Sequence, residues 1–465
     1  MGIRFHNTLT RAVEPFSPMR AGEVGLYTCG PTVYDYAHIG NFRTYLWEDL
    51  LRRHLECRGF QVTQVMNLTD VDDKTIAGAL KNGRALDDHT KTYIDAFFED
   101  LDALGIQRAA LYPRATQHVP EMTALMERLR AGGHLYESKG SIYFRIDTFP
   151  TYGRLSGLDP DSAAAGQARI DADEYDKDNP RDFAVWKMRK GEEPFWESPF
   201  GAGRPGWHLE CSAMSLKYLG ETFDIHTGGV DNIFPHHENE IAQSEAATGK
   251  PFVRTWLHAA HLIVDGEKMS KSKGNFFTLR DLMARGHRPR PIRYLLLSAH
   301  YRKQLNFTFE GLGQAEASLC RLDDLADRLG RTPLDAGTSD LSERAFRARE
   351  EMLEALDNDL NTAAALAPLF DLVRDANTAL DAGTARAGDG AAVRETLGVF
   401  EQVFGIRLGP EGCLDSEVEA LIEKRQAARA ARDWAGADAI RKELVERGIL
   451  LEDTPQGVRW KRKGS

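Results

Sequence analysis

Residues 23–66 read EVGLYTCGPTVYDYAHIGNFRTYLWEDLLRRHLECRGFQVTQVM. The segment 23–29 is short and apolar and runs into a Gly-Pro pair, which is typical of a strand that ends in a turn. In the segment 37–57 leucines recur on one face with the period of a helix, and after a glycine the segment 60–66 is rich in β-branched residues. A strand, a helix and a second strand in this order predict an α/β fold whose parallel sheet has right-handed crossovers.

The same alternation breaks off and later resumes. The stretch 116–205 is punctuated by prolines and glycines, so we expect it to be an inserted, less regular subdomain. Beyond it we expect a strand at 223–226, a helix at 236–247 and a strand at 259–264. The expected units are an α/β domain formed by 1–115 and 206–275, a connective insertion at 116–205, a helical region at 276–330, a helical bundle at 341–408 with a loop at 381–390, and a small α+β unit at 416–465.

The composition is that of a soluble globular protein: of 465 residues, 42% are hydrophobic and 28% charged, and the formal net charge is −11. No stretch reaches the roughly 18 uncharged apolar residues of a membrane span, and the first residues lack the apolar segment of a signal peptide. The five cysteines are scattered without a C-x-x-C pair, which favours a reducing compartment in which thiols stay free or bind metal. We therefore expect a cytoplasmic protein without membrane contact.

The C-terminal unit differs from the rest in charge. Between 416 and 465 there are eleven Lys and Arg and nine Asp and Glu, so this unit carries +2. A predicted helix pair precedes a hairpin whose second strand contains Trp460 among basic residues. Such a ring can stack a nucleic-acid base while the cations hold its phosphates. A tryptophan that covers the helix pair explains the pattern equally well.

The turn between the first strand and the first helix reads Tyr34-Asp-Tyr-Ala-His38-Ile-Gly40-Asn41. A helix N-terminus presents free N–H groups and the positive end of the helix dipole, which suit a phosphate. Gly40 lets a nucleotide approach the backbone, and His38 can donate to phosphoryl oxygens. Taken alone, the turn is explained better by a histidine that caps the helix.

A second loop, Lys268-Met-Ser-Lys271-Ser-Lys-Gly, follows the strand expected at 259–264. Its lysines and hydroxyls can hold a polyphosphate and neutralise a departing pyrophosphate, although a solvated basic loop has the same composition. Together, a His-Ile-Gly turn and a Lys-Met-Ser-Lys-Ser loop resemble the two signatures of class I aminoacyl-tRNA synthetases. The resemblance implies a Rossmann-type catalytic domain that activates an amino acid as its adenylate. The sequence departs from that family at Asn41, where a second His is usual.

A third group of residues consists of metal-ligand types. Two of them, His236 and Glu240, are spaced i, i+4 and share one helical face. The other two, Cys29 and Cys211, are so far apart that spacing alone favours buried structural thiols. A zinc hydrolase is an alternative, but its H-E-x-x-H pattern is absent.

Five motifs between residues 27 and 240 resemble, in the right order, the cysteinyl-tRNA synthetase family, and the resemblance as a whole runs from about 5 to 463. They are YTCGPTVYD at 27–35, NLTDVDDK at 67–74, GWHLECSAM at 206–214, DIHTGGVD at 224–231 and FPHHENE at 234–240. The resemblance implies one zinc ion that binds the thiolate of the substrate cysteine and thereby separates it from serine. The ligands that it implies are Cys29, Cys211, His236 and Glu240. His237 and Glu238 are then neighbours of the metal, not ligands.

The resemblance also assigns side chains to the other substrates. It implies a cysteine pocket formed by Thr69, Trp207 and His226, and an ATP ribose contact at Gly229 and Asp231. For the ATP phosphates, it implies His38, Gly40, Asn41, Lys268 and Lys271, of which His38 and the two lysines are the expected catalytic residues. ATP would bind with Mg²⁺, and 416–465 would bind the anticodon of tRNA(Cys). We expect a monomer.

The implied reaction joins L-cysteine to ATP as cysteinyl-adenylate and then transfers cysteine to its tRNA. A related ATP-dependent ligase that joins cysteine to an amino sugar shares the catalytic core, but it would not need the C-terminal unit. A zinc hydrolase and a non-catalytic RNA-binding zinc protein are the alternatives from other classes.

Overall fold

The structure is a computed structural model that describes residues 2–158, 181–409, 416–431, 433–447, 449–454 and 457–462. Its centre is a four-stranded parallel sheet with the strand order β10-β9-β3-β4. The strands are β3 (Glu23–Thr28), β4 (Gln61–Met66), β9 (Phe223–Gly229) and β10 (Val253–Ala259). Because β3 pairs directly with β9, segments from before and after the insertion share one sheet, and the predicted α/β class is confirmed.

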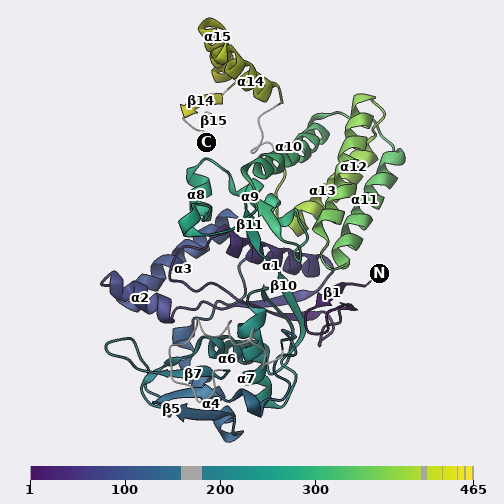
Figure 1. Ribbon diagram of the computed structural model, residues 1–465. Helices are drawn as coiled ribbons and strands as arrows, with labels where there is room; N and C mark the ends of the chain where they lie inside the picture. Colours follow the sequence, from purple (N-terminus) through teal and green to yellow (C-terminus); the bar gives the residue numbers. More distant parts are fainter. Residues whose placement is uncertain are drawn as a thin grey trace.

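Helix α1 (Ile39–Cys57) packs against this sheet and connects β3 to β4 (Figure 1). The leucines predicted to share one face, Leu46, Leu50, Leu51 and Leu55, are fully buried. Burying a leucine side chain contributes about 1.5–3 kcal/mol, so this face fixes the helix on the sheet. The helix N-terminus is thereby held where β3 ends.

The opposite face of the sheet is covered by helices α6 (Trp207–Leu219) and α7 (Glu238–Thr248), which pack on each other. Helices on both faces are the usual arrangement for a parallel sheet, since such strands are buried on both sides. Helix α7 begins later than the predicted helix, because Ile233–His237 forms a separate π-turn.

The insertion contains helix α4 (Val119–Ala131) and an antiparallel sheet with the order β5-β6-β7-β8. Its strands are β5 (Leu135–Ser138), β6 (Ser141–Phe144), β7 (Phe183–Met188) and β8 (Gly203–Pro205). The expectation of a less regular subdomain is therefore wrong for the described part. Glycines such as Gly140, at φ +83°, make the turns between short strands. Residues 159–180 lie outside the described part.

The strand predicted at 259–264 is in fact two strands. Strand β10 ends at Ala259, and β11 (Leu262–Val264) joins a different sheet, where it pairs with β12 (Glu267–Lys268) and β13 (Leu305–Phe307). The chain leaves the central sheet at Ala260, whose N–H donates to the carbonyl of Tyr301. Most of β10 escaped prediction because polar residues such as Arg254 and Thr255 interrupt its apolar pattern.

A continuous hydrophobic core extends from the central sheet through α1 into the helices that follow. The remaining elements before the C-terminal unit are β1 (Arg4–Asn7), β2 (Ala12–Pro15), α2 (Asp73–Lys81), α3 (Leu86–Ala103), α8 (Leu279–Ala284), α9 (Pro289–Leu297), α10 (Phe309–Arg331), α11 (Asp340–Asp357), α12 (Thr362–Asp381) and α13 (Ala387–Phe404). The predicted bundle is confirmed, but the loop expected at 381–390 is shorter because α13 starts inside it.

The C-terminal unit contains the predicted helix pair and hairpin. Its elements are α14 (Ser416–Ala430), α15 (Trp434–Glu446), β14 (Ile449–Thr454) and β15 (Gly457–Arg462). It has a small core of its own around Leu444, Ile449 and Leu451, and it stands apart from the bundle at the top of Figure 1. The side chains of 459–465, including the ring of Trp460, lie outside the described part.

The sequence also predicts the state of the cysteines and the absence of membrane-spanning segments. Cys29, Cys57 and Cys211 are free, but Cys320 in α10 is disulfide-bonded, so the expectation of free or metal-bound thiols is wrong at this position. Scattered cysteines can still be brought together by folding, which spacing along the chain does not show. Among the described residues, no helix combines the length and the apolar character that a bilayer crossing requires.

Candidate functional site

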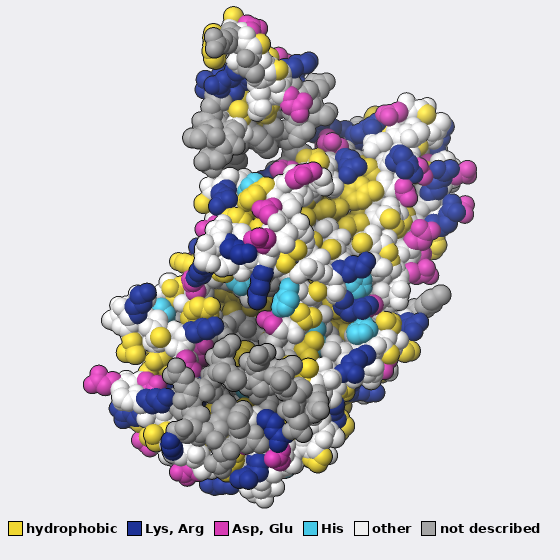
Figure 2. Space-filling model, in the orientation of Figure 1, with side chains coloured by type: hydrophobic (Ala, Val, Ile, Leu, Met, Phe, Trp, Pro, Cys, Tyr) yellow, Lys and Arg dark blue, Asp and Glu magenta, His cyan; other side chains and the backbone are white. Residues whose placement is uncertain are grey.

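A cavity of about 680 Å³ lies at the carboxyl ends of strands β3, β9 and β10. This edge is where open α/β sheets bind their ligands. The predicted site residues that line it are Cys29, His38, Gly40, Asn41, Trp207, Gly229, Asp231 and Lys268. The others, Thr69, Cys211, His226, His236, Glu240 and Lys271, are not part of its lining. Figure 2 shows histidine and basic side chains on the face between the helical bundle and the insertion.

His38 and Asn41 hold each other at the start of α1. The backbone N–H of Asn41 donates to His38 Nδ1 at 3.2 Å, and the N–H of His38 donates to Asn41 Oδ1 at 3.1 Å. This is a capping box, in which two free donors of the first helical turn are satisfied reciprocally. The turn could be explained by a histidine that caps the helix or by one that binds phosphate. His38 caps the helix and also lines the cavity, so it can do both.

The cap also sets the proton of the His38 ring. Burial lowers its pKa, which favours the neutral imidazole. Since Nδ1 accepts from the backbone, the proton of the neutral ring lies on Nε2. That tautomer can donate a hydrogen bond to a phosphoryl oxygen. Asn41, the departure from the usual second His, has a structural function in keeping this arrangement.

The lysine loop packs directly against the helix start. A Cβ atom at Gly40 would lie 2.7 Å from Cε of Met269, so a larger residue would require the Met269 side chain to shift. Lys268 ends β12 and lines the cavity. Lys271 lies in a short 3₁₀ turn (Lys271–Lys273), where its Nζ is 2.6 Å from Oδ2 of Asp35. Sequence reasoning missed Asp35 although it lies within the quoted 27–35 motif.

The four predicted metal ligands converge although they come from three separate elements. One donor atom from each of Cys29, Cys211, His236 and Glu240 lies within 4.8 Å of the others. Cys29 follows β3, Cys211 lies in α6, and the other two flank the start of α7. Nε2 of His236 is 3.0 Å from Oε1 of Glu240, as the i, i+4 spacing predicts.

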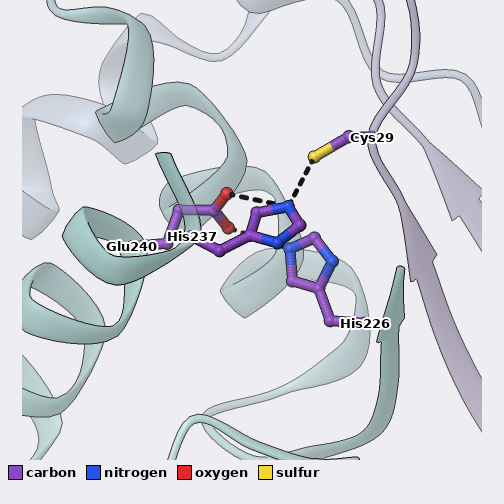
Figure 3. Close-up of side chains that lie close together, drawn as sticks. All are labelled: Cys29, His226, His237 and Glu240. Carbon is purple, nitrogen blue, oxygen red and sulfur yellow. Dashed lines mark hydrogen bonds and ion pairs between the residues drawn. The ribbon is translucent and has the colours of Figure 1, made fainter. Parts of the chain in front are cut away.

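Two histidines enter the same cluster from another side. Cys29, His226, His237 and Glu240 form a second set of donor atoms within 4.8 Å (Figure 3). Nε2 of His226 is 3.0 Å from Oε2 of Glu240, and Nε2 of His237 is 3.3 Å from the sulfur of Cys29. The ring of His237 thus contacts a predicted ligand directly, and the expectation that it is a neighbour of the metal and not a ligand stays a prediction.

Outer partners hold these rings in place. Nδ1 of His236 is 2.9 Å from Nδ1 of His208, and Nδ1 of His237 is 2.8 Å from Nε2 of His258. This series of polar contacts continues to Thr8, whose hydroxyl oxygen is 2.7 Å from Nδ1 of His258. Partners of this kind fix ring orientation around metal sites. Nothing in the sequence spacing connects Thr8 with the cluster.

Burial dominates the electrostatics of the cluster. It lowers the pKa of His236 and of His226 to about 3 and raises the pKa of Glu240 to about 7. A hydrogen bond with Cys211 and burial raise the pKa of Cys29. The bond with Cys29 lowers the pKa of the Cys211 thiol, but burial and nearby carboxylates raise it overall. Without a cation, burial therefore favours the neutral form of each group.

These residues fit a zinc ion. Two thiols, one imidazole and one carboxylate are all zinc-ligand types. Oε1 of Glu240 is buried and accepts no hydrogen bond within the described structure, although Nε2 of His236 is near. A buried acceptor without a donor is costly. A cation would satisfy it and would favour the ionised thiolates.

The predicted cysteine pocket divides into two parts. Trp207 lines the cavity with 42% of its surface exposed and stacks on His236, with 4.2 Å between ring centroids. Thr69 and His226 are buried beneath the cavity and do not line it. The Thr69 hydroxyl donates to Oε2 of Glu210 at 2.8 Å. Cys29 is the residue that belongs to both the cavity and the donor cluster.

The predicted ribose contacts lie on the β9 side of the same cavity. A Cβ atom at Gly229 would clash with Oδ1 of Asp231, so a larger residue would require the Asp231 side chain to shift. Asn232 accepts from the N–H of Gly229 at 3.1 Å and also lines the cavity. Sequence reasoning missed Asn232, which directly follows the quoted motif, and Gln304, which no motif indicates.

Solved structures share this fold. The chain matches Mycobacterium tuberculosis methionyl-tRNA synthetase in complex with methionyl-adenylate, with a TM-score of 0.61 and 18% identity. The match covers 83% of this chain and 90% of that structure. A second structure of the same Mycobacterium tuberculosis enzyme, bound by methionyl-adenylate, has a TM-score of 0.60 and 16% identity, covering 83% of this chain and 90% of that one. The fold and the two signature segments on one cavity define a class I aminoacyl-tRNA synthetase.

Sequence comparisons identify the family within that class. Three family models match: tRNA synthetases class I (C) catalytic domain at 15–317, DALR domain at 351–409, and Cysteinyl-tRNA ligase anticodon binding domain at 412–460. Curated proteins named cysteine--tRNA ligase match along the whole chain. That of Solibacter usitatus is 52% identical, covering 100% of both chains, and that of Brachyspira hyodysenteriae is 50% identical, covering 99% of both. The chain belongs to the cysteinyl-tRNA synthetase family.

Proposed function

We propose that this chain is a cysteine--tRNA ligase, which activates L-cysteine with ATP and transfers it to tRNA(Cys). One observation carries the proposal beyond family membership. Cys29 belongs both to the cavity that carries the two nucleotide signatures and to the cluster of metal-ligand atoms. A substrate whose carboxylate faces the α-phosphate can therefore direct its side chain toward the cluster.

We propose that Cys29, Cys211, His236 and Glu240 hold one zinc ion. When bound, zinc supplies a Lewis acid that prefers a thiolate to a hydroxyl. Trp207 stacks on His236 and closes the cavity at this point, while His208 holds the other nitrogen of the His236 ring. We assign Thr69 and His226 to support beneath the pocket, because both are buried and contact Glu210 and Glu240 respectively.

In the activation step, a carboxylate oxygen of cysteine attacks the α-phosphorus of ATP, and the bond to the departing pyrophosphate breaks. His38 donates from Nε2 to an α-phosphate oxygen, and the N-terminus of α1 adds its free N–H groups. Lys268 and Lys271, with Mg²⁺ on the phosphates, stabilise the negative charge that grows on pyrophosphate. Asp231 accepts from a ribose hydroxyl. Positioning and electrostatics account for the rate, and no covalent enzyme intermediate forms.

In the transfer step, a hydroxyl of the terminal tRNA ribose attacks the carbonyl carbon of the adenylate, and AMP leaves. The family model at 412–460 supports an anticodon contact by the unit 416–465. The division into a catalytic domain (1–115 and 206–275), an insertion (116–205), a stem-contact region (276–330), a bundle (341–408) and this unit belongs to the same proposal. We further propose that the protein is a cytoplasmic monomer.

The amino-sugar ligase is the alternative that shares the catalytic core. The match of 412–460 to an anticodon binding domain disfavours it, because a small-molecule ligase needs no such unit. A zinc hydrolase would require no ATP site, whereas both nucleotide signatures line or border the cavity here. A non-catalytic RNA-binding protein would not need Lys268 and His38 on one cavity.

Cysteine-dependent ATP–pyrophosphate exchange, followed by charging of tRNA(Cys), tests the proposal. We expect exchange without tRNA and no exchange with serine in place of cysteine. Charging of an amino sugar instead of tRNA would replace the proposed function by the ligase alternative. Absence of cysteine-dependent exchange in the folded protein would contradict it altogether.

A further inference from the structure

The two signature segments of the cavity contact each other mainly through backbone and apolar groups. The N–H of Ile39 donates to the carbonyl of Phe277 at 2.9 Å, and the rings of His38 and Phe276 meet edge to face at 5.0 Å. Met269 fills the space next to Gly40. These contacts fix the base of the lysine loop, but they do not hold the charged ends of its lysine side chains in position.

The loop is closed at its base by its own polar groups. Asn275 accepts from the N–H of Ser270 at 2.8 Å and donates to the carbonyl of Lys268 at 3.3 Å. The tip of the loop therefore projects as a separate turn. At this tip Lys273 pairs with Glu267 at 2.9 Å, which is a contact within the loop.

Lys271 is different, because its partner lies on the other signature segment. Its Nζ is 2.6 Å from Oδ2 of Asp35, a residue that precedes α1 and lines the cavity. Among the described residues, this is the one ion pair between segments 34–41 and 267–278. The ammonium also lies 5.1 Å from the centre of the Phe276 ring.

The geometry leaves Lys271 available to a ligand. An ammonium group has three donors, and the contact with Asp35 uses one of them. The side chain of Lys271 is 66% exposed and that of Asp35 is 36% exposed. A free lysine side chain has large rotamer entropy, so a partner at the rim of the cavity reduces the entropy that is lost when phosphate binds.

We infer that Asp35 is a positioning residue, which holds the ammonium of Lys271 at the rim of the cavity before ATP binds and keeps it oriented toward the departing pyrophosphate. This inference rests on the proposed function. In the proposed function, Asp35 itself contacts neither ATP nor cysteine. Its effect on the reaction is therefore exerted entirely through Lys271.

The test compares Asp35→Asn with wild type and with the matched control Glu267→Gln, which removes the ion pair within the loop. An exposed ion pair contributes about 0.2–1 kcal/mol, so kcat/KM for ATP in the exchange reaction should fall about 1.4- to fivefold in Asp35→Asn. KM for cysteine should not change. Glu267→Gln should match wild type, and Asp35→Glu should restore most of the lost rate.

A double-mutant cycle identifies the route of the effect. In the Lys271→Ala background, Asp35→Asn should cause no additional loss. Hydrogen exchange of the loop 268–276 in the free protein gives a readout that does not depend on cysteine or ATP, and it should be faster in Asp35→Asn. If the wild-type protein showed no cysteine-dependent ATP–pyrophosphate exchange, the proposed function would be contradicted. The hydrogen-exchange result would still test the contact between Asp35 and Lys271.

Three results would overturn the inference. One is a rate for Asp35→Asn equal to that of wild type. Another is a faster reaction, which would make Asp35 a restraint on Lys271 instead of a guide. The third is an equal loss with and without Lys271, which would give Asp35 an effect of its own.

Discussion

Cys211 shows how a single residue can combine burial with chemistry. It is 1% exposed, lies in α6, and has a donor atom near those of Cys29, His236 and Glu240. Burial raises the pKa of the Cys211 thiol and so favours its protonated form when no metal is present. A bound cation would displace the proton and stabilise the thiolate, which is the form that binds metal. Metal content and thiol selectivity should therefore depend on Cys211 together.

Cys211→Ser should lose the bound zinc and, with it, discrimination against serine. A serine hydroxyl is much less acidic than a thiol and is a weaker zinc ligand. Zinc per chain can be measured by elemental analysis, and selectivity by exchange with cysteine or serine. Cys57→Ser is the matched control, since Cys57 is free, half-buried and outside the cluster. Full zinc content with unchanged selectivity in Cys211→Ser would remove this residue from the site.

Lys271→Ala should lower the rate of adenylate formation by about 100-fold or more, which is the usual effect of removing a group that stabilises transition-state charge. Cysteine binding should change little, because the charge that Lys271 meets grows only as pyrophosphate leaves. Pre-steady-state adenylate formation and equilibrium binding separate the two quantities. Lys273→Ala provides a control on the same loop, with an exposed lysine that pairs locally. Equal rates for Lys271→Ala and wild type would exclude Lys271 from the mechanism.

The capping box of α1 illustrates the scale of the element. It uses Asn41 to hold His38, and it places the helix N-terminus beside the loop 268–276. Asn is a residue that favours helix termini through its side-chain hydrogen bonds. In this chain the Asn41 side chain therefore holds the turn and also lines the cavity.

Asn41→Ala should reduce the free energy of unfolding by about 0.5–1.5 kcal/mol, the usual net contribution of one hydrogen bond, because it removes the acceptor of the His38 N–H. Asn41→Asp keeps the acceptor and should retain most of this stability. Denaturant unfolding measures the difference, with Asn82→Ala as a control because Asn82 ends α2 without a side-chain bond to the helix. If Asn41→Ala were as stable as wild type, the box would not contribute to the stability of α1.

The elements that could be predicted are those with a strong local pattern. Leu46, Leu50 and Leu55 repeat with the helical period and are all buried in α1. Strand β10 was largely missed because Arg254 interrupts its apolar run, and pairing with β9 makes it a strand nonetheless. Local pattern cannot show such tertiary support.

The same limit applies to the candidate site. Cys29, Cys211, His236 and Glu240 could be predicted from family motifs, but the contact of His237 with the Cys29 sulfur depends on how β3 meets the start of α7. Asp35 was missed because its partner Lys271 is 236 residues away in the sequence. Ion pairs between distant segments have no signal in either segment alone.

At the scale of the whole molecule, activation and tRNA binding are assigned to separate units. Among the residues that the structure describes, the continuous core that supports the cavity ends at Leu408, and the C-terminal unit has its own small core. The C-terminal unit also carries +2 in a chain whose net charge is −11. An excess of positive charge of this kind supplies affinity for the phosphate backbone, while specific contacts determine which tRNA is bound.

Deleting 416–465 should therefore leave cysteine-dependent pyrophosphate exchange largely intact and strongly reduce charging of tRNA(Cys). The reduction follows because remote contacts with the substrate supply binding energy that orients the reacting ribose. Exchange, charging and the thermal unfolding midpoint should be measured on the same preparation. A unit that only stabilises the bundle would lower both activities together with the unfolding midpoint. If the truncated, folded protein charged tRNA at the full rate, the anticodon contact assigned to this unit would be wrong. Exchange without charging would instead place the tRNA contact beyond residue 415, in the part of the chain that adds nothing to the cavity.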